Sequence, residues 1–294
     1  MKTDDTMLER VEEYLRYRRA LGYALRIEGE MLLGFGRFAD QAGHRGPLTS
    51  SLAIRWARLP AKASRIYWAK RLEAVVGFAR YCRIFDDRSQ IPSKRMFGPA
   101  HRRNPPFLYS QRQLRQLADP GPDSDCPGNF MKMTHATVFG LLACTGLRIS
   151  EALRLRQADV DLDSAIITVR QSKCRRLRIV PLHPSASAAL RTYAKRRDRR
   201  FPGADFFFAN RSGQAIAYST IRSAFRNLTI QLGWVDEGKR PRLHDLRHTF
   251  ASRVLRKWNN RSDGGENRID WLSIYLGHEC VSDTYWYLSA CLLY

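Results

Sequence analysis

The sequence predicts a mainly α-helical protein with a small antiparallel β-sheet, an α+β fold divided into two domains. Three observations carry this prediction. Apolar residues recur at helical spacing along most of the chain. Two short runs rich in β-branched residues, 165–169 and 177–182, flank a basic segment, as in a β-hairpin. Pro105 and Pro106 cannot continue a helix, and 294 residues suffice for about two domains.

We expect residues 1–103 to form a helical N-terminal domain, residues 104–109 a linker and residues 110–294 a second domain. In the first domain, helices are predicted at 7–19, 27–40, 49–58 and 62–83. The last of these has a continuous apolar stripe, formed by Ile66, Ala69, Leu72, Val75, Val76 and Ala79. Basic residues cover its remaining faces.

The second domain is expected to begin with a helix at Ser110, a favourable N-cap residue. Its further elements follow in chain order: a loop at 119–129, a buried helix ending near Cys144, the hairpin, a helix at 184–199, a short strand at 206–208, helices at 218–232, 244–257 and 269–276, and a polar loop at 259–268. This domain is therefore predicted to be mainly helical around a small sheet.

The charge of the chain favours a polyanionic partner. The formal net charge is +22, and both parts are basic: residues 1–105 carry 21 basic and 11 acidic side chains, and residues 106–294 carry 29 and 17. A positive field over two domains favours nucleic acid. Apolar residues make up 44% of the chain, which excludes a disordered protein.

Six scattered cysteines without C-x-x-C pairs argue against a disulfide framework or a thiolate zinc site. The N-terminus has no apolar signal segment, and the longest strongly apolar stretch, Val138 to Cys144, is too short to span a bilayer. We therefore expect a cytoplasmic, DNA-associated protein without a membrane partner.

Six polar residues stand out because each lies in a distinctive local context. Arg148 lies in T-G-L-R-I-S-E-A-L, Lys173 in the basic turn of the hairpin, His244 and Arg247 in H-D-L-R-H, and His278 at the end of L-G-H; Tyr287 follows nine residues later. Arginines bind two phosphoryl oxygens at once and stay charged. A tyrosine can act as a nucleophile, so this set can cut and rejoin a phosphodiester without a metal or cofactor.

In this order, the motifs resemble the tyrosine recombinase (phage integrase) family over most of residues 110–290. The resemblance implies a catalytic domain there and a DNA-clamping, core-binding domain in residues 1–103. It implies that Tyr287 attacks the scissile phosphate and that Arg148 and Arg247 hold its non-bridging oxygens. Lys173 would protonate the leaving 5′ oxygen, His244 would assist proton transfer, and His278 would hydrogen-bond the phosphate.

Glu151 lies three residues after Arg148, so we expect it to orient that arginine. Arg175 and Arg176 are rivals for the role of Lys173, and Tyr285 is the rival of Tyr287. The implied partners are double-stranded DNA and, on DNA, three further copies of the chain, with accessory recombination proteins left open. The short tail after Tyr287 suggests a monomer in the absence of DNA.

Three other functions remain open from the sequence. A type IB topoisomerase uses similar chemistry, and an inactive relative would keep DNA binding alone. The third is a zinc metallohydrolase, because His244 and His248 stand four residues apart on one helix face and His278 could be a third ligand. Against zinc, Asp245 replaces the glutamate of H-E-x-x-H and Arg247 brings a positive charge. In the recombinase interpretation, His248 is a buried structural residue.

Overall fold

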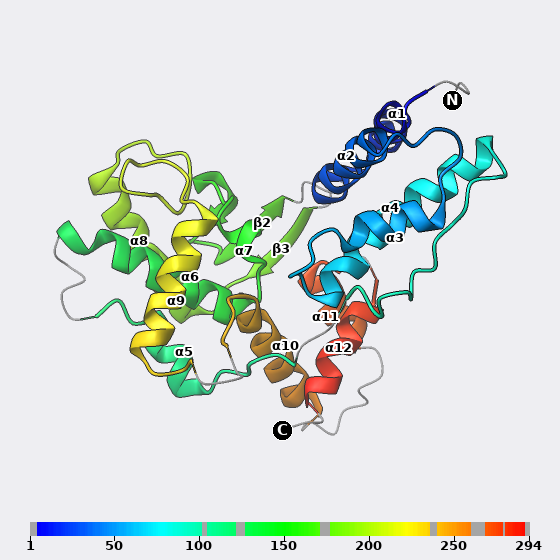
Figure 1. The fold of residues 1–294 in the computed structure, drawn as a ribbon. Helices are drawn as coiled ribbons and strands as arrows, with labels where there is room; N and C mark the ends of the chain where they lie inside the picture. The colour runs from blue at the N-terminus through cyan, green and yellow to red at the C-terminus, as the bar shows by residue number, and fades with distance from the viewer. Residues whose placement is uncertain are drawn as a thin grey trace. The chain divides into compact units, whose positions relative to one another are not determined.

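The computed structural model describes residues 5–101, 105–121, 127–170, 177–235, 240–259, 268–278 and 280–291 (Figure 1). Its internal contacts divide the chain into two compact units, Met1–Asn104 and Pro105–Tyr294. Helices predominate, and the described residues form one three-stranded antiparallel sheet. The predicted fold class is therefore confirmed.

The N-terminal unit contains a helix close to each predicted position. These helices are α1 (Met7–Ala20), α2 (Arg26–Gln41), α3 (Ser50–Arg58) and α4 (Arg65–Phe85). The fourth begins three residues later than the periodicity indicated. Ser64 is its N-cap, and the Ser64 hydroxyl accepts a hydrogen bond from the backbone N–H of Tyr67. A cap of this kind satisfies a first-turn donor that would otherwise lack a partner.

The first two helices of this unit approach each other closely. A Cβ built on Gly36 would lie 2.8 Å from the Leu8 Cα, so only glycine fits there. The Asp40 carboxylate accepts the backbone N–H groups of Met7 and Leu8 at 2.8 and 3.1 Å. Phe35, packed edge to face on Trp56 and Phe78, lies in the core beneath them. The apolar faces of all four helices thus meet in one core.

The second unit is built around the long buried helix α6. Its helices are α5 (Gln111–Ala118), α6 (Phe130–Thr145), α7 (Ile149–Ala152), α8 (Pro184–Arg200), α9 (Tyr218–Gln231), α10 (His244–Asn259), α11 (Arg268–Leu276) and α12 (Ser282–Cys291), with 3-10 turns η2 (Pro127–Asn129) and η3 (Gln157–Asp159). Helix α6 has contacts with α5, α8, α9 and α10, and α12 packs on α10 and α11 (Figure 1). The helix α12 was not predicted from the sequence.

The sheet has the order β1 (Val160–Asp161), β2 (Ile166–Arg170) and β3 (Leu177–Pro181), all antiparallel. The two predicted strands are present, whereas the two-residue β1 was missed. The strand predicted at 206–208 is wrong. Phe206 forms a single isolated bridge with Arg156, and Phe207 and Phe208 are buried in the core. Their apolar character reflects side-chain packing, not a ladder of strand hydrogen bonds.

Several predictions fall on residues outside the described ranges. They concern the hairpin turn at 171–176 with Lys173, Arg175 and Arg176, most of the predicted loop at 259–268, and the end of the C-terminal tail. Among the described residues, no helix has both the length and the apolar character needed to cross a bilayer.

Candidate active site

Five of the six predicted site residues lie in the described part of the second unit, and the structure brings them together from four segments. Arg148 is the N-cap of α7, His244 and Arg247 lie in the first turn of α10, His278 follows α11, and Tyr287 lies on α12. Lys173, the sixth, lies outside the described residues. The contacts described below join these segments directly.

Arg247 is the centre of this arrangement, although only 2% of the residue is exposed. Its Nη1 donates to the Gly146 carbonyl at 2.8 Å, and its Nη2 donates to the Leu276 carbonyl at 2.7 Å. Its Nε reaches the Tyr287 hydroxyl at 3.4 Å. Across the described residues, no ion pair joins Arg247 to a carboxylate. A buried guanidinium held only by neutral groups is an incomplete arrangement that an anion would complete.

Arg148 is held by two groups and is more accessible, with 37% of its side chain exposed. Its Nη1 donates to Glu151 Oε1 at 3.0 Å, and its Nη2 donates to the Gly277 carbonyl at 2.9 Å. The backbone N–H of Arg148 donates to Glu151 Oε2 at 2.8 Å. Glu151 thus contacts both the backbone and the guanidinium of Arg148, the geometry that an orienting residue requires.

Both arginines are anchored at helix C-termini, where the last carbonyls lack partners within the helix. Leu276 and Gly277 end α11, and Gly146 ends α6; both glycines adopt positive φ angles, +67° and +63°. At Gly146 a Cβ would lie 2.5 Å from the Phe250 ring, so a side chain is excluded there. The T-G-L-R and L-G-H motifs therefore have a structural reason: each glycine ends a helix and leaves a carbonyl facing an arginine.

Glu151 also binds a second arginine, Arg178 of β3, which the sequence analysis did not single out. Arg178 donates to both carboxylate oxygens, at 3.0 and 2.6 Å. Burial alone would raise the pKa of Glu151, but the hydrogen bonds from Arg178 and Arg148 outweigh it and hold the pKa at about 2. Glu151 is therefore ionised at neutral pH.

Tyr287 is buried in a small cluster with Ala251, Leu255, Leu272 and Leu276 and is only 3% exposed. Its hydroxyl nevertheless meets Arg247, as described above. Tyr285 is 55% exposed and lies on another side of α12. The structure thus brings Tyr287 to Arg247 of the same chain, whereas Tyr285 is exposed to solvent.

His278 stacks on the Tyr287 ring, with 5.8 Å between ring centroids and 17° between planes. Its Nδ1 lies 2.8 Å from the hydroxyl of Thr284, a residue that is fully buried on α12. Burial, followed by the nearby Arg247 and Arg148, lowers the pKa of His278 to about 4. The ring is neutral at pH 7, so only one of its nitrogens carries a proton.

His248 is 8% exposed and lies between the rings of Tyr287 and His244, at centroid distances of 5.0 and 4.9 Å. Its Nδ1 is buried without a hydrogen-bond partner, and burial lowers its pKa to about 3. His244 is more exposed; partial removal from water and the charge of Arg247 lower its pKa as well. His248 thus packs on Tyr287 as a neutral ring.

The metal interpretation finds little support in this geometry. The Asp245 carboxylate, at the position of the metalloprotease glutamate, is engaged by Arg242, with contacts of 2.7 to 3.1 Å. Within the described ranges, no group of three or more His, Cys, Asp or Glu side chains is arranged to hold a metal ion. His248 and His278 instead pack on the ring of Tyr287, and His244 packs on His248.

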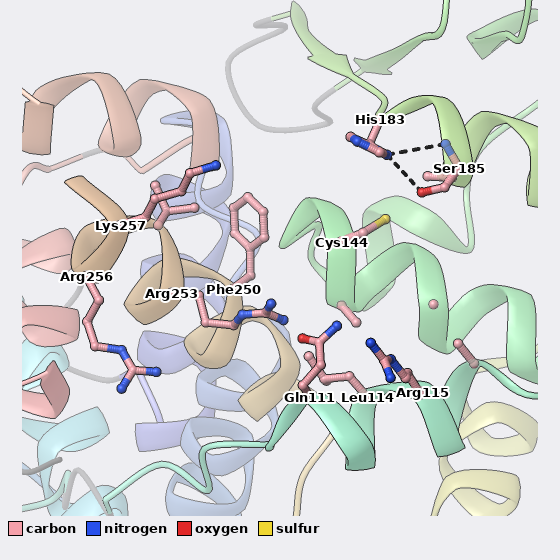
Figure 2. A pocket seen from close by; sticks show the side chains of 15 residues that line it. Gln111, Leu114, Arg115, Cys144, His183, Ser185, Phe250, Arg253, Arg256 and Lys257 are labelled. Atoms are coloured by element: carbon pink, nitrogen blue, oxygen red, sulfur yellow. Dashed lines mark hydrogen bonds between the residues drawn. The ribbon is translucent and has the colours of Figure 1, made fainter. Parts of the chain in front are cut away.

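A separate groove of about 1110 Å³ lies on the same unit (Figure 2). It is lined by α5, α6, α10 and the start of α8, and contains Gln111, Arg115, Cys144, Phe250 and Arg253. None of the five described site residues lines it. The candidate active site is therefore a charged cluster on helix ends and is separate from this groove.

The chain matches the phage integrase family over residues 111–290. It is 36% identical to the putative integrase/recombinase y4rB of Sinorhizobium fredii, over 97% of this chain and 93% of that protein. It is 31% identical to the tyrosine recombinase XerC of Xanthomonas campestris pv. campestris, over 63% of this chain and 51% of that protein.

Solved structures share the fold. The Tn1549 transposon integrase in complex with transposon right end DNA has a TM-score of 0.71 and 18% identity, over 96% of this chain and 94% of that one. A lambda integrase dimer bound to a COC′ core site has a TM-score of 0.65 and 13% identity, over 96% and 77% of the two chains. With the sequence match over most of the second unit, the chain belongs to the phage integrase family of tyrosine recombinases, which are DNA strand-transferring enzymes.

Proposed function

We propose that this protein is a site-specific DNA recombinase that cuts and rejoins DNA through a covalent 3′-phosphotyrosine at Tyr287. One observation carries the proposal. The buried guanidinium of Arg247 has no carboxylate partner among the described residues and contacts the Tyr287 hydroxyl at 3.4 Å. An anion binding beside Arg247 would therefore lie next to a nucleophile. A DNA phosphate is the anion that fits a chain with a net charge of +22.

In the proposed reaction, the Tyr287 oxygen forms a bond to phosphorus while the bond from phosphorus to the 5′ oxygen breaks. The tyrosine loses its proton, and the leaving 5′ oxygen takes one from Lys173. Arg148 and Arg247 neutralise the charge that develops on the non-bridging oxygens. The phosphotyrosine bond conserves the energy of the broken linkage. A 5′ hydroxyl can therefore reverse the reaction without ATP.

The histidines assist this chemistry through their neutral state. When His278 Nδ1 accepts a hydrogen bond from the Thr284 hydroxyl, its Nε2 carries the ring's proton and donates a hydrogen bond to the phosphate. His244, at the start of α10, can accept the proton of Tyr287. Their lowered pKa values keep both rings neutral near pH 7, so each can donate or accept as its tautomer dictates.

We further propose that four copies act on two DNA sites and exchange strands through a Holliday junction, with residues 1–103 clamping the duplex. Two of the solved structures with this fold contain DNA: XerH is bound to its difH substrate, and lambda integrase is bound to a core site. They support DNA as the partner. The basic residues of the N-terminal unit support its role in the clamp.

Action on cytoplasmic DNA fits the scattered cysteines, of which Cys82, Cys144 and Cys280 are free thiols.

The test traps the covalent intermediate. The full-length protein is expressed with the DNA that flanks its gene, the cells are lysed in denaturant, and DNA attached to the protein is sequenced. Tyr287→Phe should reduce the adduct by at least ~1000-fold, because the remaining groups only position and stabilise the phosphate. DNA binding should persist, since one hydroxyl is lost.

Tyr285→Phe is the matched control and should form the adduct normally. Peptide mapping that finds DNA on Tyr285 would refute the assignment. Adduct formation should also persist in EDTA, and a loss that zinc restores would favour the metallohydrolase. Relaxation of supercoiled DNA without sequence preference would instead indicate a topoisomerase. Binding without any adduct would identify an inactive relative.

A further inference from the structure

Arg178 is a partly buried arginine beside the site, and its role does not follow from the family motifs quoted above. It lies on β3, and only 11% of its side chain is exposed. The strand alternates in an unusual way: Leu177 and Ile179 are 65% and 64% exposed, whereas Arg178 and Val180 face the protein. A charged side chain on the inner face of a strand requires a partner there.

That partner is Glu151, whose two oxygens are shared between two arginines. Oε1 accepts from Arg148 Nη1 and Arg178 Nη1, both at 3.0 Å. Oε2 accepts from the Arg148 backbone at 2.8 Å and from Arg178 Nη2 at 2.6 Å. Without Arg178, half of these contacts would be lost, and the carboxylate could rotate away from the orientation that holds Arg148.

Arg178 also ties the hairpin to the arginine box. It pairs with Val169 of β2 in the sheet, and β3 is the strand that returns from the segment containing Lys173. Lys173 lies five residues before Arg178 in the sequence. The Arg178–Glu151 ion pair therefore joins the base of the hairpin to α7, whose first residue follows Arg148.

We infer that Arg178 is a positioning residue for strand cleavage. Through Glu151 it fixes the guanidinium of Arg148, and through β3 it fixes the base of the hairpin that carries Lys173. This inference rests on the proposed function, because it assumes that Arg148 and Lys173 act on a phosphate. Arg178 itself need not touch DNA.

The experiment measures single-turnover cleavage on a nicked substrate with saturating full-length protein, alongside DNA affinity. Arg178→Gln should slow cleavage by about 100-fold, the scale expected when a catalytic group is misplaced by roughly 1 Å. DNA affinity should stay unchanged. Arg178→Lys, which keeps the charge but not the bidentate geometry, should recover part of the rate.

Arg197→Gln is the matched control for general destabilisation. Arg197 is a buried arginine of this unit; it pairs with Asp198 and donates to the Phe207 carbonyl, and no contact joins it to a described site residue. Its variant should cleave at the rate of the unmodified protein. If Arg178→Gln and Arg197→Gln slow cleavage equally, Arg178 only stabilises the fold, and the inference is wrong.

Coupling to Arg148 separates positioning from stability. If Arg178 acts through Arg148, then Arg148→Lys combined with Arg178→Gln should be less impaired than the product of the two single effects. If the loss of cleavage rate in the double variant equals the product of the two single losses, the inference is contradicted. Failure of the unmodified protein to form an adduct refutes the proposed function; normal cleavage by Arg178→Gln refutes only this inference.

Discussion

At the scale of single residues, the site is defined by which charges are paired and which are not. Glu151 compensates Arg148 and Arg178, whereas Arg247 is held by two carbonyls and a hydroxyl. Removing a guanidinium from water without a counter-ion is unfavourable. The fold tolerates this arrangement because the carbonyls at the ends of α6 and α11 replace part of its hydration, and a bound phosphate would supply the missing charge.

The neutral histidines predict a pH-dependent stability. The pKa values of His248 and His278 are lowered by burial to about 3 and about 4, whereas an unfolded chain would hold these groups near 6.5. Between those values the unfolded state binds more protons. The titration of these two histidines therefore leaves the free energy of unfolding unaffected above pH 6.5. The free energy of unfolding decreases as the pH falls below 6.5, by up to about 1.4 kcal/mol per pH unit for each histidine.

The measurement is urea unfolding between pH 5 and 7. This pH range lies above the pKa values of ordinary carboxylates, so their titration does not interfere. His248→Phe should show a shallower loss of stability, because the ring that cannot protonate no longer contributes. The substitution removes no hydrogen bond at Nδ1, which has no partner. Identical pH dependence in the two proteins would contradict the burial-driven shift at His248.

At the scale of elements, the helix ends hold the two arginines, and the strand β3 lies next to the segment that contains Lys173 in the sequence. The end of α6 and the end of α11 anchor Arg247, and the end of α11 also anchors Arg148. The predicted acid, Lys173, precedes β3 in the sequence, and β3 is tied to α7 by the Arg178–Glu151 ion pair. Cleavage in this scheme requires both groups of contacts, but only the hairpin supplies a proton to the leaving oxygen.

A sulfur substitution tests the assignment of Lys173. Lys173→Ala should slow cleavage by about 100-fold or more and leave DNA binding unchanged, since a general acid contributes on the order of 100- to 10,000-fold. A substrate with sulfur in place of the leaving 5′ oxygen should restore the rate, because a thiolate leaves without a proton. Arg175→Ala and Arg176→Ala are the controls. Rescue of either control, but not of Lys173→Ala, would move the acid to that arginine.

The elements also show what the sequence could predict. Long amphipathic helices such as α2 and α4 were predicted within a few residues, because their apolar periodicity reflects one buried face. Helix α12 was missed because Tyr285, Trp286 and Tyr287 form an aromatic run without clear periodicity. The short β1 is defined only by its pairing with β2, which no local pattern reveals.

The candidate site residues were chosen from the family motifs and their order, and five of them lie together in the structure, whereas Arg178 was missed. A signal for it was present: a single arginine among apolar residues in the predicted strand at 177–182. The sequence could not show that Leu177 and Ile179 face outward and Arg178 inward, because this depends on groups from other parts of the chain, among them Glu151. Long-range ion pairs of this kind carry no local pattern.

At the scale of the whole molecule, both units are basic, so binding should depend steeply on salt. Each neutralised phosphate contributes about −0.9 to the slope of log K against log salt, and a clamp that engages roughly six to ten phosphates should give a slope of about −5 to −9. Fluorescence anisotropy on duplex DNA from 50 to 300 mM salt, on the order of the range used for such slopes, measures it.

Circular dichroism across the same salt series is the control, because unfolding would mimic release. A nearly flat dependence would mean that few phosphates are contacted, and the proposed clamp would be wrong. A slope of about −2 would indicate contact by the active site alone, without the N-terminal unit.

The contact between Tyr287 and Arg247 has a genetic consequence. Both side chains belong to one polypeptide and lie in one unit, so under the proposed mechanism each subunit would carry its own nucleophile and its own phosphate-binding arginine. Under the proposed mechanism, two defective alleles, one lacking the tyrosine and the other lacking the arginine, cannot complement each other in a mixed assembly. A mobile element encoding such a protein gains nothing from a second damaged copy in the same cell, and only recombination between the alleles restores an active gene.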